Sequence, residues 1–249
     1  MVWREPVEDD PAGSEVDVWA IPLDETSGRL IGVQLSAGEA ERAEGIRTAR
    51  DRSRFVTSRL WLRRLLADRL AVSPEVIVYG ASVLGKPELV SPPRSDLQFS
   101  LSRSGVWCVC AIAAARPVGV DVEECAGRPD LGRTERRFFS DGERASLAGL
   151  SGADRLRGFY RIWARKEAVL KAAGVGLAGE WAALDTTKDV VTFADGSWPL
   201  PSAAVSGSWS VRDLPMEPGY AAAISLRGRF GDPLRLRRAG VVGERAGAG

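Results

Sequence analysis

The hydrophobic and polar positions of this chain predict two long helices, each preceded by a shorter one. A serine three residues before a glutamate, at Ser36 and again at Ser140, is the signature of a capping box at a helix start. Apolar residues at helical spacing then predict long helices over about 51–71 and about 154–173. The short helices are expected to begin at the two serines, and the first is expected to run to about Arg50.

Short apolar runs bounded by turn residues predict the strands. They are expected at 16–21, 76–79, 97–101, 106–113, 117–123, 190–194, 207–213 and 220–226. Residues 126–134, which are rich in Gly, Arg and Pro, are expected to form a loop. Helices followed by strands occur twice, before and after about residue 115, although the residues themselves show no clear repeat.

This order divides the chain into four regions. An acidic arm at 1–15 is followed by an N-terminal subdomain at 16–115 and a C-terminal subdomain at 116–226. The Arg-, Gly- and Ala-rich residues 227–249 are expected to be a disordered tail.

The composition removes several kinds of chemistry. The 249 residues contain no histidine, which excludes Ser-His-Asp triads, Cys-His dyads and histidine-ligated zinc. Cys108, Cys110 and Cys125 have neither disulfide nor zinc spacing, and the first two are expected in a core strand. A net charge of +1 gives no reason to expect nucleic acid or an anionic membrane as a partner. Because neither a signal region nor a long apolar run is present, we expect a cytoplasmic protein.

A first acidic motif lies at residues 117–123, Pro-Val-Gly-Val-Asp-Val-Glu. In a strand, alternation places Gly119, Asp121 and Glu123 on one face and the valines on the other, toward a core. The carboxylates would emerge side by side above a glycine where a ligand could approach. They can converge on one divalent cation if a third ligand comes from elsewhere. The alternative is an edge strand with solvated acids.

A second motif lies at residues 163–171, Trp-Ala-Arg-Lys-Glu-Ala-Val-Leu-Lys. On a helix, Glu167 and Lys171 are four residues apart and share one face. Together the two motifs offer three carboxylates and a lysine, which suits a divalent cation that holds a phosphate. The alternative is an ordinary helical salt bridge, which contributes little to stability.

Basic and hydroxyl side chains near turns form a third candidate site. Residues 85–87, Gly-Lys-Pro, and residues 99–105, Phe-Ser-Leu-Ser-Arg-Ser-Gly, combine the groups that bind phosphate. The basic N-terminal helical region adds Arg42, Arg47, Arg54 and Arg59. For both segments the alternative is a solvated surface.

Taken together, these motifs resemble those of the 4′-phosphopantetheinyl transferases, in particular the long Sfp-type enzymes. That family pattern is an apolar-Gly-apolar-Asp-x-Glu strand, a gap of about this size, and Trp-x-x-Lys-Glu-Ala-x-x-Lys. Both parts are present here, as are the Gly-Lys-Pro and Phe-Ser-x-Ser-x-Ser-Gly segments. The Arg-Phe-Phe-Ser at 137–140 and the Gly-Tyr-Ala-Ala-Ala at 219–223 also match, so the resemblance runs from about Arg42 to Leu226.

The resemblance implies an α+β fold of two pseudo-symmetric α/β subdomains, each a small sheet packed by helices, with coenzyme A in the cleft between them. It implies transfer of the 4′-phosphopantetheine arm of coenzyme A to a serine of an apo acyl or peptidyl carrier protein, with release of adenosine 3′,5′-bisphosphate. Because one chain contains both halves, a monomer is expected.

The resemblance also assigns roles to residues. Asp121, Glu123 and Glu167 are expected to hold Mg²⁺, for which Mn²⁺ could substitute. Glu167 is expected to take the serine proton, and Lys171 to bind a phosphate oxygen. The expected coenzyme A contacts are Lys86, Ser102, Arg103, Arg42, Arg54 and Lys171. The carrier protein is expected to dock near Gly174, Leu177 and Trp181. The family often has histidine in place of Arg103, and an arginine there stays charged at every pH.

Two other functions stay open from the residues alone. A different Mg²⁺-dependent phosphotransferase or pyrophosphatase could use the same carboxylates, although no Walker Gly-x-x-x-x-Gly-Lys-Ser/Thr loop is present. A non-catalytic scaffold that binds carrier proteins could retain the fold, although intact acidic motifs argue against it.

Overall fold

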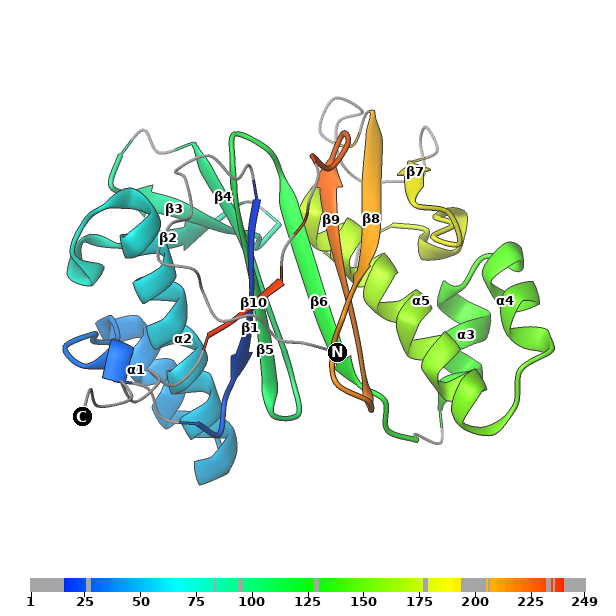
Figure 1. Ribbon diagram of the computed structural model, residues 1–249, viewed down its shortest axis with the longest axis horizontal. Coiled ribbons are helices and arrows are strands. Elements are labelled where there is room, and N and C mark those ends of the chain that lie inside the picture. The colour runs from blue at the N-terminus through cyan, green and yellow to red at the C-terminus, as the bar shows by residue number, and fades with distance from the viewer. Residues whose placement is uncertain are drawn as a thin grey trace, which may run out of the picture.

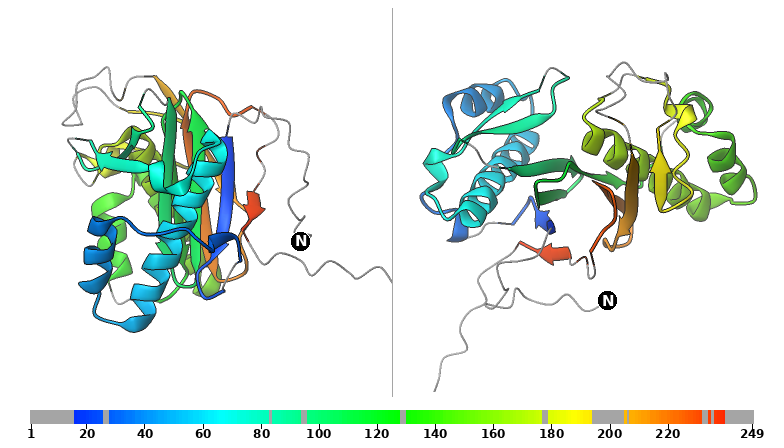
Figure 2. Two further views of the ribbon diagram at one scale, coloured as in Figure 1. Left: turned by 90° about the vertical axis from the view of Figure 1, so that its left-hand side faces the viewer. Right: turned by 90° about the horizontal axis from the view of Figure 1, so that it is seen from above.

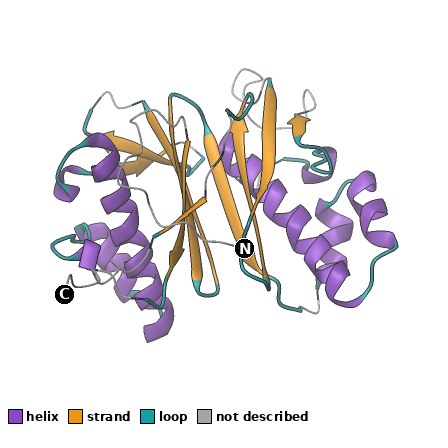
Figure 3. Cartoon of the chain, in the orientation of Figure 1, coloured by secondary structure: helices purple, strands orange, loops and turns teal. Residues whose placement is uncertain are grey.

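Two four-stranded sheets pack face to face in the middle of the molecule, with helices on the outer side of each sheet (Figures 1 and 3). The computed structural model describes residues 16–25, 28–82, 84–93, 96–127, 130–176, 179–193, 205, 207–231, 234 and 236–239. Within these residues the chain has the predicted α+β fold of two related halves.

The N-terminal half combines the first sheet with two helices and a small hairpin. The sheet order is β10 (Leu236–Arg238), β1 (Val16–Pro22), β5 (Trp107–Ala114) and β4 (Leu97–Ser104). The other elements are η1 (Gly28–Leu30), α1 (Ala37–Glu44), α2 (Ala49–Leu70), η2 (Pro74–Val76), β2 (Val78–Ala81) and β3 (Pro87–Ser91). Strand β4 is an edge strand of this sheet, which leaves it beside the C-terminal half.

The C-terminal half repeats the arrangement around the second sheet. The sheet order is β6 (Val118–Glu124), β9 (Tyr220–Arg227), β8 (Ser208–Leu214) and β7 (Val190–Thr192). Its helices are α3 (Leu131–Phe138), α4 (Asp141–Ala148), α5 (Gly152–Ala173) and η3 (Trp181–Ala183). Helix α5 lies across β6 and β9, so it covers the outer face of this sheet.

The central core lies between the two sheets. Val118, Val120 and Val122 of β6 are buried there against residues of β1 and β5 such as Val18 and Val109. This confirms that the three valines of the first acidic motif face a core. Fully burying a side chain of this size contributes about 1.5–3 kcal/mol, so the alternation of β6 is strongly fixed.

Local signals account for the helix boundaries. Both predicted capping boxes are present, with Ser36 and Ser140 each accepting from the backbone of the glutamate three residues later. The first short helix ends earlier than expected, at Glu44, because Thr48 begins α2 by accepting a hydrogen bond from Asp51 N at 3.0 Å. Gly174, with φ +72°, ends α5 as predicted.

Three predictions about irregular regions are wrong. Part of the expected loop at 126–134 is helical, because α3 packs Phe138 against Trp163 and Trp181. The predicted strand at 76–79 begins later, at Val78, and pairs with β3, which was not predicted. The expected tail contributes β10, which pairs in parallel with β1.

Strand β10 is held by side chains as well as by the backbone. Ala239 N donates to Ala20 O at 2.8 Å, and the Arg237 and Arg238 guanidinium groups lie 5.3 Å and 5.2 Å from the rings of Trp19 and Trp107. The sequence predicted a disordered tail here, but these two arginines pack on aromatic rings of the first sheet. The predicted arm at 1–15 lies outside the described residues. No helix in the described part of the chain could cross a membrane.

Candidate active site

The candidate site lies where the two halves meet, along the seam between β4 and β6. Figure 2 shows the halves side by side, with α5 of the C-terminal half covering β6. At Gly119 the helix approaches so closely that a Cβ would lie 2.1 Å from Ala168 O and 2.3 Å from Ala172 N. The glycine therefore serves helix packing, and the prediction that it leaves room for a ligand is wrong.

Asp121, Lys171 and Ser102 meet at the centre of the seam. Lys171 Nζ donates to Asp121 Oδ1 at 2.6 Å, and Ser102 Oγ donates to the same oxygen at 2.7 Å. Burial raises the pKa of Asp121, although Lys171 opposes this effect. Burial alone would lower the pKa of Lys171, but the carboxylates of Asp121 and Glu167 outweigh it and raise that pKa. The ion pair therefore joins the two predicted motifs in one place.

The charges of Asp121 and Lys171 act on the neighbouring carboxyl group of Glu167. Burial raises the pKa of Glu167 to about 7, with further repulsion from Asp121 and Glu123, while Lys171 acts in the opposite direction. A carboxyl group with this pKa is partly ionised at neutral pH, which suits a group that exchanges protons.

Glu123 is oriented by neutral donors. Ser104 Oγ donates to Glu123 Oε2 at 3.1 Å, and Trp163 Nε1 donates to Glu123 Oε1 at 3.2 Å. Serines at alternate positions of β4 thus contact both carboxylates of β6, since Ser102 contacts Asp121. The sequence signal for this arrangement was the period-2 spacing of Ser100, Ser102 and Ser104.

The three carboxylates share one region without forming a ready-made ligand cluster. Among the described residues, no group of three His, Cys, Asp or Glu side chains already converges as metal ligands. The donor set nevertheless fits a divalent cation, because Asp121 Oδ2 is buried and has no hydrogen-bond partner in the described part of the chain. The carboxylates also repel one another, which a cation would relieve.

An arginine cluster surrounds the ring of Phe55 on α2. The guanidinium carbons of Arg103, Arg59 and Arg42 lie 5.2, 5.3 and 5.9 Å from the ring centroid. Burial, followed by repulsion from Arg103, lowers the pKa of Arg59. Arg59 Nε is buried without a hydrogen-bond partner among the described residues. Guanidinium groups gathered in this way are suited to binding an anion such as phosphate.

The predicted coenzyme A contacts lie in different places in the structure. Arg42 and Arg103 lie in the arginine cluster, and Arg59, which was not among the predicted contacts, completes it. Arg54 instead binds Asp24 through two hydrogen bonds of 2.8 and 2.7 Å. Ser102 lies with Asp121 rather than in the cluster, because alternate residues of β4 point to opposite faces.

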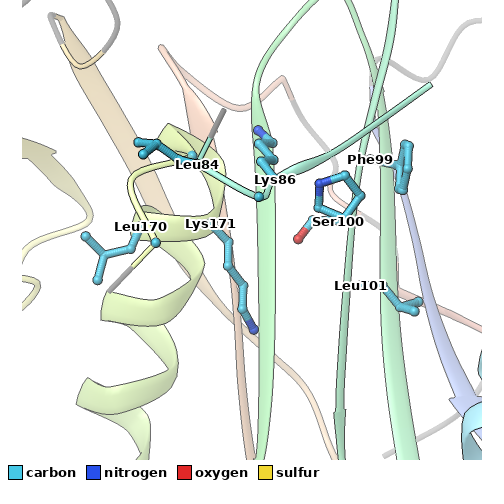
Figure 4. A pocket seen from close by; sticks show the side chains of 11 residues that line it. Leu84, Lys86, Phe99, Ser100, Leu101, Leu170 and Lys171 are labelled. Atoms are coloured by element: carbon cyan, nitrogen blue, oxygen red, sulfur yellow. The ribbon is translucent and has the colours of Figure 1, made fainter. Parts of the chain in front are cut away.

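Lys86 lies at the C-terminal end of α5. Its Nζ donates to Ala172 O at 2.8 Å, and burial lowers its pKa to about 8. Beside it a cavity of about 240 Å³ opens between the halves (Figure 4). The walls are largely apolar and include Leu84, Phe99, Leu101 and Leu170, with Lys171 at one side.

The three residues predicted to lie near the bound carrier protein have different surroundings in the structure. Gly174 lines the cavity. Leu177 lies outside the described residues. Trp181 is only 2% exposed and packs on Phe138 and Trp163, so the prediction that its ring contacts a partner is wrong.

A buried carboxylate–lysine pair, an arginine cluster and a cavity between two halves define a protein that binds a phosphate-containing ligand. The profile of the 4′-phosphopantetheinyl transferase superfamily matches residues 117–224. The chain is 31% identical to the 4′-phosphopantetheinyl transferase HetI of Nostoc sp. over 217 residues, 86% of this chain and 88% of that relative. The chain belongs to the 4′-phosphopantetheinyl transferase superfamily and is an enzyme of that class.

Two further proteins are similar over less of this chain. A phosphopantetheinyl transferase of Thraustochytrium sp. is 35% identical over 65% of this chain, and the match covers 62% of the relative. A crystal structure of a holo-(acyl-carrier-protein) synthase from Bacillus anthracis, in complex with CoA, covers 45% of this chain and 94% of that one. Its identity is 22% and its TM-score 0.33.

Proposed function

We propose that this enzyme transfers the 4′-phosphopantetheine arm of coenzyme A to a serine of an apo acyl or peptidyl carrier protein. The observation that carries the proposal is the meeting of Asp121, Lys171 and Glu167 beside a cavity that both halves line. The serine oxygen forms a bond to the phosphorus that bears pantetheine, and the bond from that phosphorus to adenosine 3′,5′-bisphosphate breaks.

The carboxylates of Asp121, Glu123 and Glu167 would hold Mg²⁺, or Mn²⁺ in its place. The unpartnered Asp121 Oδ2 and the mutual repulsion of the carboxylates support this assignment. A bound cation would supply charge neutralisation at the pyrophosphate. Binding requires Lys171 to share Asp121 with the cation, since its Nζ lies 2.6 Å from Oδ1.

Glu167 would accept the proton of the carrier serine. Its pKa of about 7 lets it hold and release a proton at neutral pH, and the chain has no histidine to compete for this role. Lys171 would bind a phosphate oxygen and stabilise the charge that develops as the bond to the leaving group breaks. Its raised pKa keeps it protonated for this purpose.

The arginine cluster and the cavity would bind different parts of coenzyme A. The cluster of Arg42, Arg59 and Arg103 suits a phosphate, because guanidinium groups bind phosphate oxygens in pairs. The largely apolar cavity suits a less charged part of the molecule, with Lys86 and Lys171 at its wall. Because β4 is an edge strand, one ligand could reach Arg103 on one face and Lys171 on the other.

The carrier protein would approach near Gly174, where the cavity opens beside α5. A monomer would suffice, because the two halves that line the cavity belong to one chain. A pyrophosphatase or a non-catalytic scaffold would use the same fold, and one assay separates all three functions.

The assay incubates the full chain with Mg²⁺, coenzyme A and an apo carrier domain, and measures the intact mass of the carrier. The expected result is a gain of one phosphopantetheine arm. Hydrolysis of coenzyme A without any mass gain would favour a pyrophosphatase, and carrier binding without transfer would favour a scaffold. A panel of fatty-acid, polyketide and peptide carriers, compared by kcat/KM, would identify the preferred partner.

A further inference from the structure

Glu123 is held at both carboxylate oxygens by side chains from opposite halves of the molecule. Trp163 Nε1 on α5 donates to Oε1 at 3.2 Å, and Ser104 Oγ on β4 donates to Oε2 at 3.1 Å. Neither donor carries a charge, so together they set the direction of the carboxylate without neutralising it. Asp121 differs, because its Oδ1 is paired with the ammonium group of Lys171.

The indole of Trp163 is fixed by the rings around it. Its centroid lies 5.8 Å from that of Phe138 on α3, 5.3 Å from that of Trp181 in η3 and 6.4 Å from that of Phe159, whose ring is parallel to it. Trp181 is almost fully buried. Rings on several sides prevent the indole from turning, so its N–H stays directed at Glu123.

The hydroxyl of Ser104 is fixed by a second hydrogen bond. Its oxygen accepts from Glu124 N at 2.9 Å, which leaves the single hydroxyl hydrogen for Glu123. The turn that follows holds Ser104 in place: Gly105 has φ +55°, and a Cβ there would lie 2.2 Å from the hydroxyl of Tyr220. No other residue fits this turn without displacing that tyrosine.

The N-terminal half lacks the same arrangement at the corresponding place. Leu60 stands eleven residues after the start of α2, as Trp163 stands eleven residues after the start of α5. The strand under α2 presents Ile21 to its helix, where β6 presents Glu123. An indole N–H therefore occurs at this helix position only in the half where the neighbouring strand carries a carboxylate.

We propose that Trp163 and Ser104 are positioning residues that orient Glu123 for the divalent cation. The inference rests on the proposed function, because it assigns Glu123 to the cation. A carboxylate held in one direction binds a metal without first losing its rotational freedom, and removing such a holding partner typically costs about 10–100-fold in metal affinity. Both residues act through Glu123, to which each donates a hydrogen bond.

Binding of Mn²⁺ to the full chain, in the presence of coenzyme A, tests this without measuring transfer. The loss of free Mn²⁺ is followed by its electron paramagnetic resonance signal for the wild type, Trp163→Phe, Ser104→Ala and Ser104→Thr. We expect the first two variants to raise the dissociation constant about tenfold, and Ser104→Thr to restore it because it keeps the hydroxyl.

Ser100→Ala is the matched control. Ser100 lies on the same face of β4 and also bonds across the seam, but its partner is Val120 N at 3.1 Å and not a carboxylate. It should leave Mn²⁺ affinity within twofold of the wild type. An equal loss in Ser100→Ala and Ser104→Ala would show that the seam acts only as a structural contact, and would overturn the proposal.

The indole N–H resonance of Trp163 gives a direct reading in the wild-type fold. It is assigned by its disappearance in Trp163→Phe, and it should shift in Glu123→Gln and again when Mg²⁺ is added. An unmoved resonance in Glu123→Gln would overturn the inference. If the wild type transfers the arm and binds Mn²⁺ while Trp163→Phe and Ser104→Ala bind it equally well, the inference fails and the proposed function stands. If the wild type binds no Mn²⁺, the inference fails, and the proposed function fails with it only if the wild type also transfers no arm with Mg²⁺.

Discussion

Each half of the molecule joins an eight-residue helix to a 22-residue helix, and the two pairs correspond residue by residue. The third residue of the short helix is a glutamate that caps it, Glu39 in one half and Glu143 in the other. In each half this glutamate pairs with a cation fourteen residues after the start of the long helix, Arg63 or Lys166. The two halves therefore do share a repeat, which the sequence did not show clearly. It consists of the glutamate that caps each short helix and the buried cation that pairs with it.

The halves differ at the positions beside this shared pair. The next residue of the long helix is Arg64 in one half and Glu167 in the other, and four residues further on stand Asp68 and Lys171. Arg64 and Asp68 form a salt bridge of 2.9 Å with both side chains about one-third exposed. Lys171 instead reaches Asp121 across the seam.

The strands beneath the helices differ in the same way. Strand β1 turns Trp19 and Ile21 toward α2, whereas β6 turns Asp121 and Glu123 toward α5. In addition, β4 of the N-terminal half lies against β6 and supplies Ser102 and Ser104. The same scaffold thus stabilises both halves, and only the C-terminal half has carboxylates in place of the apolar residues, where β4 of the other half covers them. The proposed chemistry depends on these carboxylates.

The largest expected effect separates the two long helices by activity. Lys171→Met should lower kcat by about 10²–10³-fold, because it removes a charged donor aimed at the transferred phosphate. Glu167→Gln should lower kcat by about 10²–10⁴-fold, because it removes the proposed base. The matched changes in the N-terminal half, Asp68→Asn and Arg64→Gln, should leave kcat within twofold. The measurement is the initial rate of carrier mass gain, and equal losses in the two halves would contradict the comparison.

The second effect concerns the buried ion pairs. Lys166 and Glu143 are fully buried, with Nζ and Oε2 2.9 Å apart, and Lys166 also donates to the carbonyl oxygens of Trp181 and Leu184. Lys166→Met leaves the Glu143 carboxylate fully buried without its countercharge, so it should lower the free energy of unfolding by about 3–5 kcal/mol. Urea denaturation followed by circular dichroism measures this loss.

Arg63→Met is the corresponding change in the N-terminal half and should cost less, about 2 kcal/mol. The side chain of Glu39 is 9% exposed, whereas that of Glu143 is fully buried, so water can partly solvate the Glu39 carboxylate once Arg63 is removed. A larger loss for Arg63→Met than for Lys166→Met would show that the two pairs are not equivalent in the way described.

The third effect distinguishes two arginines of α2. Arg59→Met should weaken coenzyme A binding by about 10–100-fold, because a charge-assisted hydrogen bond to phosphate contributes about 1.5–3 kcal/mol. Arg54→Met should change affinity by less than threefold, since Arg54 is engaged with Asp24. Isothermal titration of both variants with coenzyme A decides between them. The reverse order would restore Arg54 as a phosphate contact.

The smallest effect is a pH dependence of coenzyme A binding. Burial lowers the pKa of Lys86 to about 8, so the ammonium loses its proton as pH rises through that value and affinity should fall several-fold. Lys86→Met should remove this step. Because deprotonation is easier in the folded state, Lys86 also makes the folded form relatively more stable as pH rises from about 8 toward 10.5.

The cluster arginine gives the complementary comparison. Arg103→His should add a fall in affinity as pH rises through about 6.5, a step that arginine does not produce because it stays charged. The ionisation of coenzyme A itself is common to both proteins, so the difference between their pH profiles isolates the side chain. Identical profiles would mean that residue 103 does not contact the ligand.

Most of the helices and the central carboxylates could be predicted from the sequence because their signals are local. Capping boxes lie within four residues, and the alternation of Val118, Val120 and Val122 determines which side chains face α5. The residues of α3 and β3 could not be assigned this way, since both elements depend on distant partners. Phe138 needs Trp181, and β3 needs β2.

The functions of several single residues also depended on distant contacts. The sequence predicted that Gly119 leaves space for a ligand, but α5 fills that space. The sequence predicted that Trp181 contacts the carrier protein, but Phe138 and Trp163 pack against it and bury it. In the sequence, Arg59 does not differ from the other arginines of its helix. Only the structure shows that it lies over the ring of Phe55 together with Arg103.

Two aspartates at different places in the two halves test most directly whether the proposed metal ligands and proton acceptor lie in the C-terminal half. The intact mass of an apo carrier domain is followed with Mg²⁺ and coenzyme A in the presence of the wild type, Asp121→Asn or Asp68→Asn. We predict that the wild type and Asp68→Asn add one phosphopantetheine arm at similar rates and that Asp121→Asn, correctly folded by circular dichroism, adds none. Transfer by Asp121→Asn at the wild-type rate would show that the reaction does not need the Asp121 carboxylate.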